Sequence, residues 1–133
     1  RATPIEYSWE GGSLYFLSEG GEKFAHIRIN PRVSVAIYDE YRGMERLAGM
    51  QIQGTASLIS PSDPQYEKTL KPRGLTPGQV TKFGFPLHLI RVQMEKIEFL
   101  NSHFQAQGYD ARQVVEGEEL ADILRSAHGP DSL

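Results

Sequence analysis

The sequence contains no cysteine and no excess of basic charge among its 133 residues. The lack of cysteine excludes disulfides, thiolate catalysis, iron–sulfur clusters and cysteine-type zinc sites in these residues, and it is compatible with the cytoplasmic location that we expect. No apolar run reaches the roughly 18 residues of a membrane span, so we expect no membrane partner. The formal net charge of −3 argues against a nucleic-acid partner, because such binders normally carry a basic excess.

Several catalytic and metal-binding patterns are also missing. The four histidines are scattered, and neither HExxH nor a histidine pair at helical spacing occurs, so we expect no metal site. There is no Gly-x-Ser-x-Gly elbow and no GxGxxG, which leaves a serine hydrolase and a second dinucleotide site without support. No side chain stands out as an acid–base catalyst, so the catalytic residues are unknown at this stage.

Apolar residues alternate with polar ones in several short runs, which predicts a mainly β protein with short helices. We expect strands over residues 2–7, 14–17, 33–38, 50–60 and 87–99. Helices are expected from Glu22 to the stop at Pro31, from the N-cap candidates in 60–64 through Leu70, and over 118–127. Segment 39–47 is expected to be a loop, 71–85 a connector with one helical turn, and 108–117 irregular. This order suggests an antiparallel barrel with helical additions, and we expect a single domain over 1–133. Because the chain opens with Arg in a strand-like pattern, we also expect a leading segment to precede it.

One segment near the start has the composition of a phosphate site. Arg1 opens the first strand, and Ser18 ends the second, just before Gly20 and Gly21. Lys23 follows in the first turn of a predicted helix, where free backbone N–H groups and the helix dipole favour an anion. A phosphate group would meet two cations and a hydroxyl there. Alternatively, the glycines supply only a turn and Lys23 is an ordinary solvated side chain.

The ordered run RATPIEY, GG-SLYFLS, EKFAHIRINPRVSVAI and IQGTASLI resembles the FMN-binding split-barrel family, the pyridoxamine 5′-phosphate oxidase-like proteins. The resemblance covers residues 1 to 60 well and the strand at 87–99 loosely. It implies a six-stranded antiparallel split barrel that forms a homodimer and holds FMN at the dimer interface.

The resemblance also implies roles for individual residues. Arg1 and Lys23 would bind the FMN phosphate, Thr3 and Ile5 would lie along the ribityl chain and ring, and the segment 16–18 would present backbone groups and small side chains. The complete set of cofactor-binding residues expected on this basis is Arg1, Thr3, Ile5, Phe16, Leu17, Ser18, Lys23 and Gln51.

The sequence departs from the oxidase pattern at several positions. Glu22 stands where the oxidase has a basic residue, and Gly49 stands where it has a glutamine, so Gln51 or Gln53 becomes the side chain expected to bond the flavin. The C-terminal substrate segment with Arg and Trp has no counterpart, since the only tryptophan is Trp9. Oxidation of pyridoxamine phosphate is therefore not expected.

The expected function is that of an FMN-binding flavoprotein, an FMN-dependent oxidoreductase acting on an unknown small molecule, with a reduced nicotinamide as one possible electron donor. Two alternatives remain open. One is a haem-binding or haem-utilisation split barrel that uses His103. The other is a cofactor-free dimeric binding module, which Glu22 and Gly49 favour. His88 is expected in the core or an interface.

Overall fold

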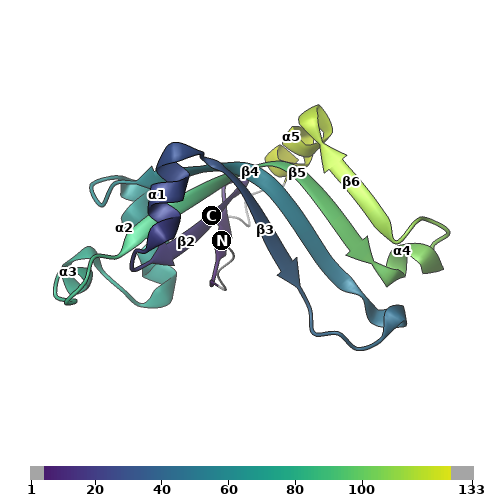
Figure 1. Ribbon diagram of the computed structural model, residues 1–133, viewed down its shortest axis with the longest axis horizontal. Coiled ribbons are helices and arrows are strands. Elements are labelled where there is room, and N and C mark those ends of the chain that lie inside the picture. Colours follow the sequence, from purple (N-terminus) through teal and green to yellow (C-terminus); the bar gives the residue numbers. More distant parts are fainter. Residues whose placement is uncertain (1–4, 127–133) are drawn as a thin grey trace. The chain divides into compact units, whose positions relative to one another are not determined.

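The computed structural model describes residues 5–126 (Figure 1). The strands are β1 (Ser8–Glu10), β2 (Ser13–Ser18), β3 (Arg32–Tyr38), β4 (Ala48–Ile59), β5 (His88–Asn101) and β6 (Arg112–Glu116). The helices are α1 (Glu22–Ile29), α2 (Pro64–Leu70), α3 (Pro77–Val80), α4 (Ser102–Ala106) and α5 (Gly117–Ser126), with 3-10 turns η1 (Met44–Arg46) and η2 (Lys71–Arg73).

The six strands form one sheet in the order β1-β2-β5-β4-β3, and β6 also pairs with β5. Strands β1 and β2 form an antiparallel hairpin, with Trp9 opposite Leu14. The turn between them is Gly11-Gly12, whose φ angles of 63° and 75° are those of a tight turn that glycine adopts without steric cost.

The chain divides into two compact units. The first contains the described residues up to Arg32 together with Thr55–Gln93, and the second contains Val33–Gly54 and the described residues from Met94 onward. Strands β4 and β5 contribute residues to both. The expectation of a single domain stays a prediction.

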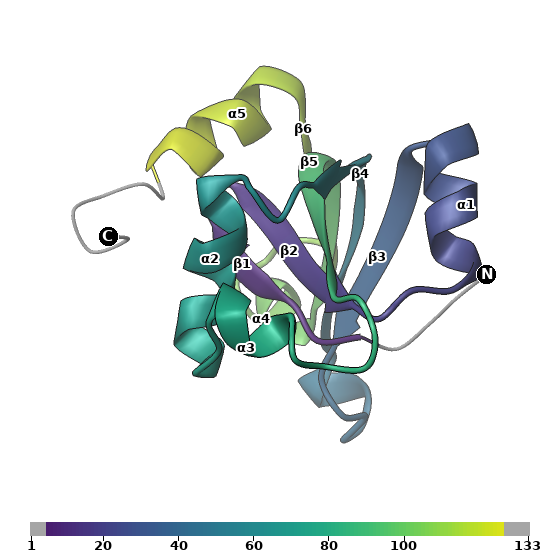
Figure 2. The ribbon, with the colours of Figure 1, turned by 90° about the vertical axis from the view of Figure 1, so that its left-hand side faces the viewer.

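The core of the first unit lies between α2, α3 and one face of strands β2 and β5 (Figure 2). Side chains on a strand alternate between its two faces, so Tyr15 and Leu17 point to this core while Phe16 points away from it. The buried members of the core cluster are Tyr15, Tyr66, Leu70, Val80 and Leu89. Inside it, the Tyr66 hydroxyl donates a hydrogen bond of 2.6 Å to the carbonyl oxygen of Leu87, and burial raises the pKa of Tyr66.

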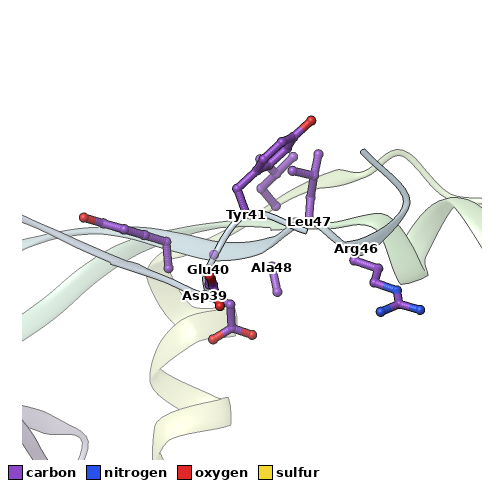
Figure 3. A pocket seen from close by; sticks show the side chains of 9 residues that line it. Asp39, Glu40, Tyr41, Arg46, Leu47 and Ala48 are labelled. Atoms are coloured by element: carbon purple, nitrogen blue, oxygen red, sulfur yellow. The ribbon is translucent and has the colours of Figure 1, made fainter. Parts of the chain in front are cut away.

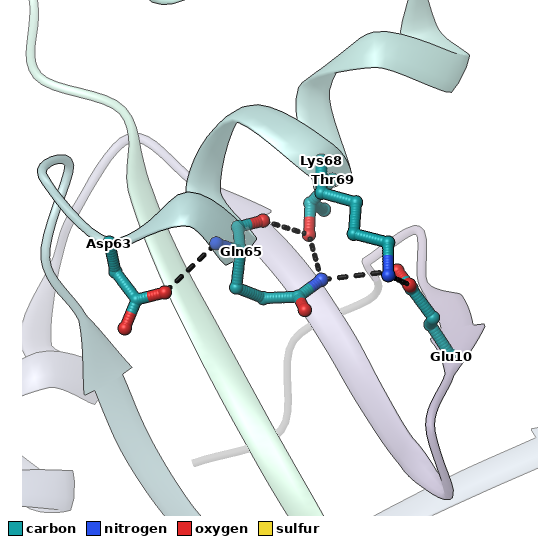
Figure 4. Close-up of polar contacts among 5 residues, drawn as sticks. All are labelled: Glu10, Asp63, Gln65, Lys68 and Thr69. Atoms are coloured by element: carbon teal, nitrogen blue, oxygen red, sulfur yellow. Dashed lines mark hydrogen bonds and ion pairs between the residues drawn. The ribbon is translucent and has the colours of Figure 1, made fainter.

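Polar contacts join helix α2 to the β1 end of the hairpin (Figure 4). Glu10 forms an ion pair with Lys68 and accepts a hydrogen bond of 3.1 Å from the Gln65 side-chain nitrogen. The same nitrogen donates to the hydroxyl of Thr69, and Asp63 caps the helix by accepting from the Gln65 backbone N–H. These bonds satisfy polar groups beside the core, so we interpret this group of polar contacts as structural.

In the second unit, β6 runs antiparallel to the last part of β5, with α4 at the connection between them (Figure 1). Ser102 ties α4 to the segment around η1, because its hydroxyl donates to the Met44 carbonyl oxygen at 2.7 Å and accepts from the Leu47 N–H at 2.9 Å. Helix α5, predicted over 118–127, is amphipathic and buries Leu120.

Some of the predicted elements differ from the structure. Residues 5–7 of the predicted strand 2–7 are irregular, and its residues 2–4 lie outside the described part. The segment 108–117, predicted to be irregular, contains β6, because pairing with β5 stabilises a short run that is too polar to be recognised alone. Helix α4 was also missed, although Asn101 gives the capping signal: its side chain accepts from the His103 N–H at 2.8 Å.

Candidate functional site

The predicted phosphate segment forms an open loop between β2 and α1. Gly20 and Gly21 have φ angles of 136° and 111°, which side chains with a Cβ rarely adopt, so both positions require glycine. A Cβ built on either residue would meet nothing within 4 Å. Gly21 is the N-cap of α1 and offers no side-chain cap, so no N-cap side chain competes with a ligand for the first N–H groups of the helix.

The ammonium group of Lys23 lies over this loop. Its Nζ donates a hydrogen bond of 2.9 Å to the carbonyl oxygen of Gly20, and it lies 5.6 Å from the centroid of the Phe24 ring. The side chain is partly buried, and both contacts hold it near the helix N-terminus. Glu22 adds a negative charge in the same turn, which opposes anion binding.

Ser18 and His88 border the loop on its strand side. Ser18 is buried at the end of β2 and pairs with His88, the first residue of β5. The His88 ring lies 4.6 Å from the Phe24 ring, measured between centroids, at an interplanar angle of 51°. Ser18, Lys23 and the two glycines thus lie along the continuous segment from the end of β2 to the first turn of α1, and their role in binding a phosphate stays a prediction. The sequence analysis did not predict the contact between the Phe24 and His88 rings, because a contact between distant segments leaves no local sequence signal.

The other predicted ligand residues of the first unit are placed differently. Phe16 is buried and its ring lies 6.5 Å from that of Tyr7, whereas Ile5 is exposed. The Leu17 side chain packs against the core cluster, so only its backbone could reach a ligand on the Phe16 face. Arg1 and Thr3 lie outside the described residues.

Gln51 belongs to the second unit, on an exposed position of β4. It lines a groove of about 190 Å³ together with residues that include Met50, Phe99 and Arg112. The role of Gln51 stays a prediction.

Gly49 lines the same groove and lies very close to β3. A Cβ on Gly49 would come within 3.2 Å of the Ile37 carbonyl oxygen and 3.3 Å of the Tyr38 Cβ. A glutamine at this position would therefore require β3 to move by a few tenths of an ångström.

A second cavity of about 140 Å³ lies beside this groove (Figure 3). Figure 3 shows that the side chains of Tyr41 and Leu47 extend to one side of the backbone. The side chains of Asp39 and Arg46 extend in different directions from these two. The charged groups do not converge on a common point, so this cavity lacks the arrangement of a charged-ligand site.

No group of three or more potential metal ligands occurs in residues 5–126. His103, the histidine considered for haem, is exposed in the first turn of α4, and His26 is exposed on α1. His128 lies outside the described residues. Among the helices described, none is long and apolar enough to cross a membrane.

The groups with shifted pKa values, Tyr15, Tyr66 and Lys68, lie away from the loop. Burial raises the pKa of Tyr15, and the Glu10 carboxylate adds to this, while Arg91 and Lys68 oppose it. The ion pair with Glu10 raises the pKa of Lys68. These groups belong to the contacts between the hairpin and α2, so their shifts mark structural pairing and give no catalytic base.

Solved structures share this fold. The chain aligns with the haem-binding protein from Mycobacterium smegmatis (TM-score 0.56, 16% identity, 89% of this chain and 48% of that one). It also aligns with ChuZ from Campylobacter jejuni (TM-score 0.61, 17% identity, 86% of this chain and 48% of that one). A third aligned structure is an FAD-binding protein from Mesorhizobium loti (TM-score 0.52, 21% identity, 71% of this chain and 72% of that one). The chain thus spans about half the length of the first two proteins. These similarities confirm the predicted class, a mainly β split barrel with a six-stranded antiparallel sheet.

Within that class, the chain belongs to the pyridoxamine 5′-phosphate oxidase family, whose sequence model matches residues 1–101. The family predicted from the sequence is therefore confirmed. No curated protein matches this chain in sequence.

Proposed function

We propose that this chain is an FMN-binding flavoprotein, and that it acts as an FMN-dependent oxidoreductase on a small molecule. The observation that carries the proposal is the position of the Lys23 ammonium group, held by the Gly20 carbonyl oxygen beside the N-terminus of α1. A lysine, a helix N-terminus and two adjacent glycines form a suitable set for a terminal phosphate. Family membership supports the choice of a phosphorylated cofactor.

The residues of the loop fit the phosphate end of FMN. Open space in front of Gly20 and Gly21 lets an anion approach the backbone, and Lys23 supplies a point charge. Ser18 offers a hydroxyl at the end of β2, and Arg1 remains a predicted second cation. Glu22 reduces the attraction, so we expect weaker binding than an all-basic loop would give.

When bound, FMN supplies hydride transfer at its ring system. The residues of this chain bind the phosphate, orient the cofactor and exclude water from it. Within the described residues, no side chain at the loop is arranged as an acid–base catalyst, and a reduced nicotinamide remains one possible electron donor. We also propose the homodimer with the cofactor at its interface that the sequence resemblance implies.

The first experiment is an absorption spectrum of the purified protein before and after FMN addition and desalting, followed by titration with FMN and with riboflavin, which lacks the phosphate. Lys23→Ala should weaken FMN binding about 10- to 150-fold, the range for a lost charge-assisted hydrogen bond, and should leave riboflavin binding nearly unchanged.

The matched control is Arg28→Ala, which removes the same charge from the last turn of the same helix. It should change FMN affinity by less than about twofold, because that end of the helix does not attract anions and solvent screens the charge. A wild-type protein that retains no FMN contradicts the proposal. Equal losses for FMN and riboflavin in Lys23→Ala would contradict the assignment of the phosphate to this loop.

Haem binding is the second function that we consider, because one aligned protein is described as haem-binding. At 16% identity this similarity concerns the fold, and exposed His103 on the five-residue helix α4 is the residue that the sequence suggests for it. The same spectrum separates the two functions: a Soret band without flavin absorption would favour haem, and Lys23→Ala would then have little effect. A protein that binds neither group would support the cofactor-free module.

A further inference from the structure

The loop between β2 and α1, residues 19–23, is flanked by Ser18 and Phe24, and both of these residues neighbour His88. Ser18, at the start of the loop, is the β2 residue paired with His88 on β5. Phe24 directly follows Lys23, and its ring lies 4.6 Å from the His88 ring. His88 therefore borders the five-residue segment 19–23 at both of its ends.

The contacts of Phe24 extend this arrangement to the lysine. The Phe24 ring is buried, with the Lys23 ammonium 5.6 Å from its centroid and the His88 ring as its aromatic neighbour. An aromatic pair holds its rings in preferred relative positions, and a ring face attracts a nearby cation. A change in the His88 ring should therefore move Phe24, and with it the ammonium group.

This support matters because the loop is costly to order. Gly20 and Gly21 lose more backbone freedom on folding than other residues would. Within the loop, the Lys23 hydrogen bond to Gly20 is a contact between residues three positions apart. His88 connects the loop to the sheet, and it lies 65 positions after Lys23 in the chain.

We propose that His88 is a positioning residue for the phosphate-binding loop, acting through its ring on Phe24 and thereby on Lys23. The inference rests on the proposed function, because it assigns His88 to the site that would hold the FMN phosphate. It assigns no proton transfer to His88: the ring itself is the positioning element. A phenylalanine at position 88 should therefore replace it, whereas an alanine should not.

The test compares FMN and riboflavin affinities of His88→Ala, His88→Phe and the matched control His26→Ala, an exposed histidine on α1. His88→Ala should weaken FMN binding about two- to tenfold, the factor expected for loss of an aromatic contact, and leave riboflavin binding unchanged. His88→Phe should restore FMN binding, and the control should match the wild type.

Combining His88→Ala with Lys23→Ala separates positioning from a general structural effect. If His88 acts through Lys23, the double variant should bind FMN no more weakly than Lys23→Ala alone. A readout without flavin is amide hydrogen exchange, which should accelerate at residues 19–23 in His88→Ala and stay unchanged in α2.

Three results would overturn the inference while leaving the proposed function intact: equal loss of FMN and riboflavin binding, additive effects in the double variant, or failure of His88→Phe to restore binding. Unchanged hydrogen exchange of the loop in His88→Ala would also overturn it. A wild-type protein that binds no FMN would instead contradict the proposed function itself, and an anion-positioning role for His88 would fail with it.

Discussion

Removing the Tyr66 hydroxyl is a direct test of how the first unit is held together next to the candidate site. The ring of Tyr66 packs in the core cluster, and its hydroxyl donates to the Leu87 carbonyl oxygen at 2.6 Å, one residue before His88. Tyr66→Phe keeps the ring and removes only the donor. We expect unfolding free energy to fall by about 1–2 kcal/mol, because a partly buried carbonyl loses its partner. At this chain length each kcal/mol corresponds to a melting temperature lower by about 3–5 °C.

Urea unfolding at pH 7, followed through the fluorescence of Trp9, measures this change, since Trp9 is the only tryptophan and lies in the same unit. The control is Tyr38→Phe, which removes a hydroxyl from a side chain that is 80% exposed. That variant should stay within about 0.5 kcal/mol of the wild type.

The pH dependence provides a second check on the same bond. Burial raises the pKa of Tyr66 above its ordinary value of 10.0, so the folded state keeps the phenol proton that the unfolded state releases. The stability linked to this group is fully present below the unfolded pKa and is lost as pH rises through the folded pKa. The stability difference between wild type and Tyr66→Phe should therefore shrink above about pH 10. A loss below about 0.5 kcal/mol at pH 7, or a difference that stays constant with pH, would refute this reasoning.

Three further predictions concern packing and loop attachment. Leu70→Ala should cost about 2–5 kcal/mol in urea unfolding, because Leu70 is fully buried in the core cluster, whereas Ile29→Ala on an 85% exposed side chain should change stability by less than about 0.5 kcal/mol. Gly49→Gln should lower stability by about 1–3 kcal/mol through crowding against β3, and equal melting temperatures would contradict that close approach. Ser102→Ala should speed hydrogen exchange at the Leu47 amide, whose acceptor it removes; an unchanged exchange rate would show that this bond does not hold the segment.

Much of the fold could be predicted from sequence because its signals are local. The Gly11-Gly12 pair before the apolar run of β2 marks the turn of the first hairpin, although β1 itself lies at Ser8–Glu10 and not in the predicted strand 2–7. Pro31 lies two residues after the end of α1. The apolar stripe of α5 is likewise visible in the sequence. By contrast, β6 was missed because its stability depends on pairing with β5, a contact that local composition does not record.

For the candidate site, the sequence by itself determined the chemical groups: a glycine pair that permits positive φ angles, a lysine in the first turn of a helix, and a serine before them. Those groups are contiguous, and their geometry follows from short-range backbone rules. Only the tertiary structure decided that Leu17 turns its side chain into the core and that His88 meets Phe24 beside Lys23. Such contacts join segments far apart in the chain, and they depend on the pairing of β2 with β5, two strands that no short turn connects.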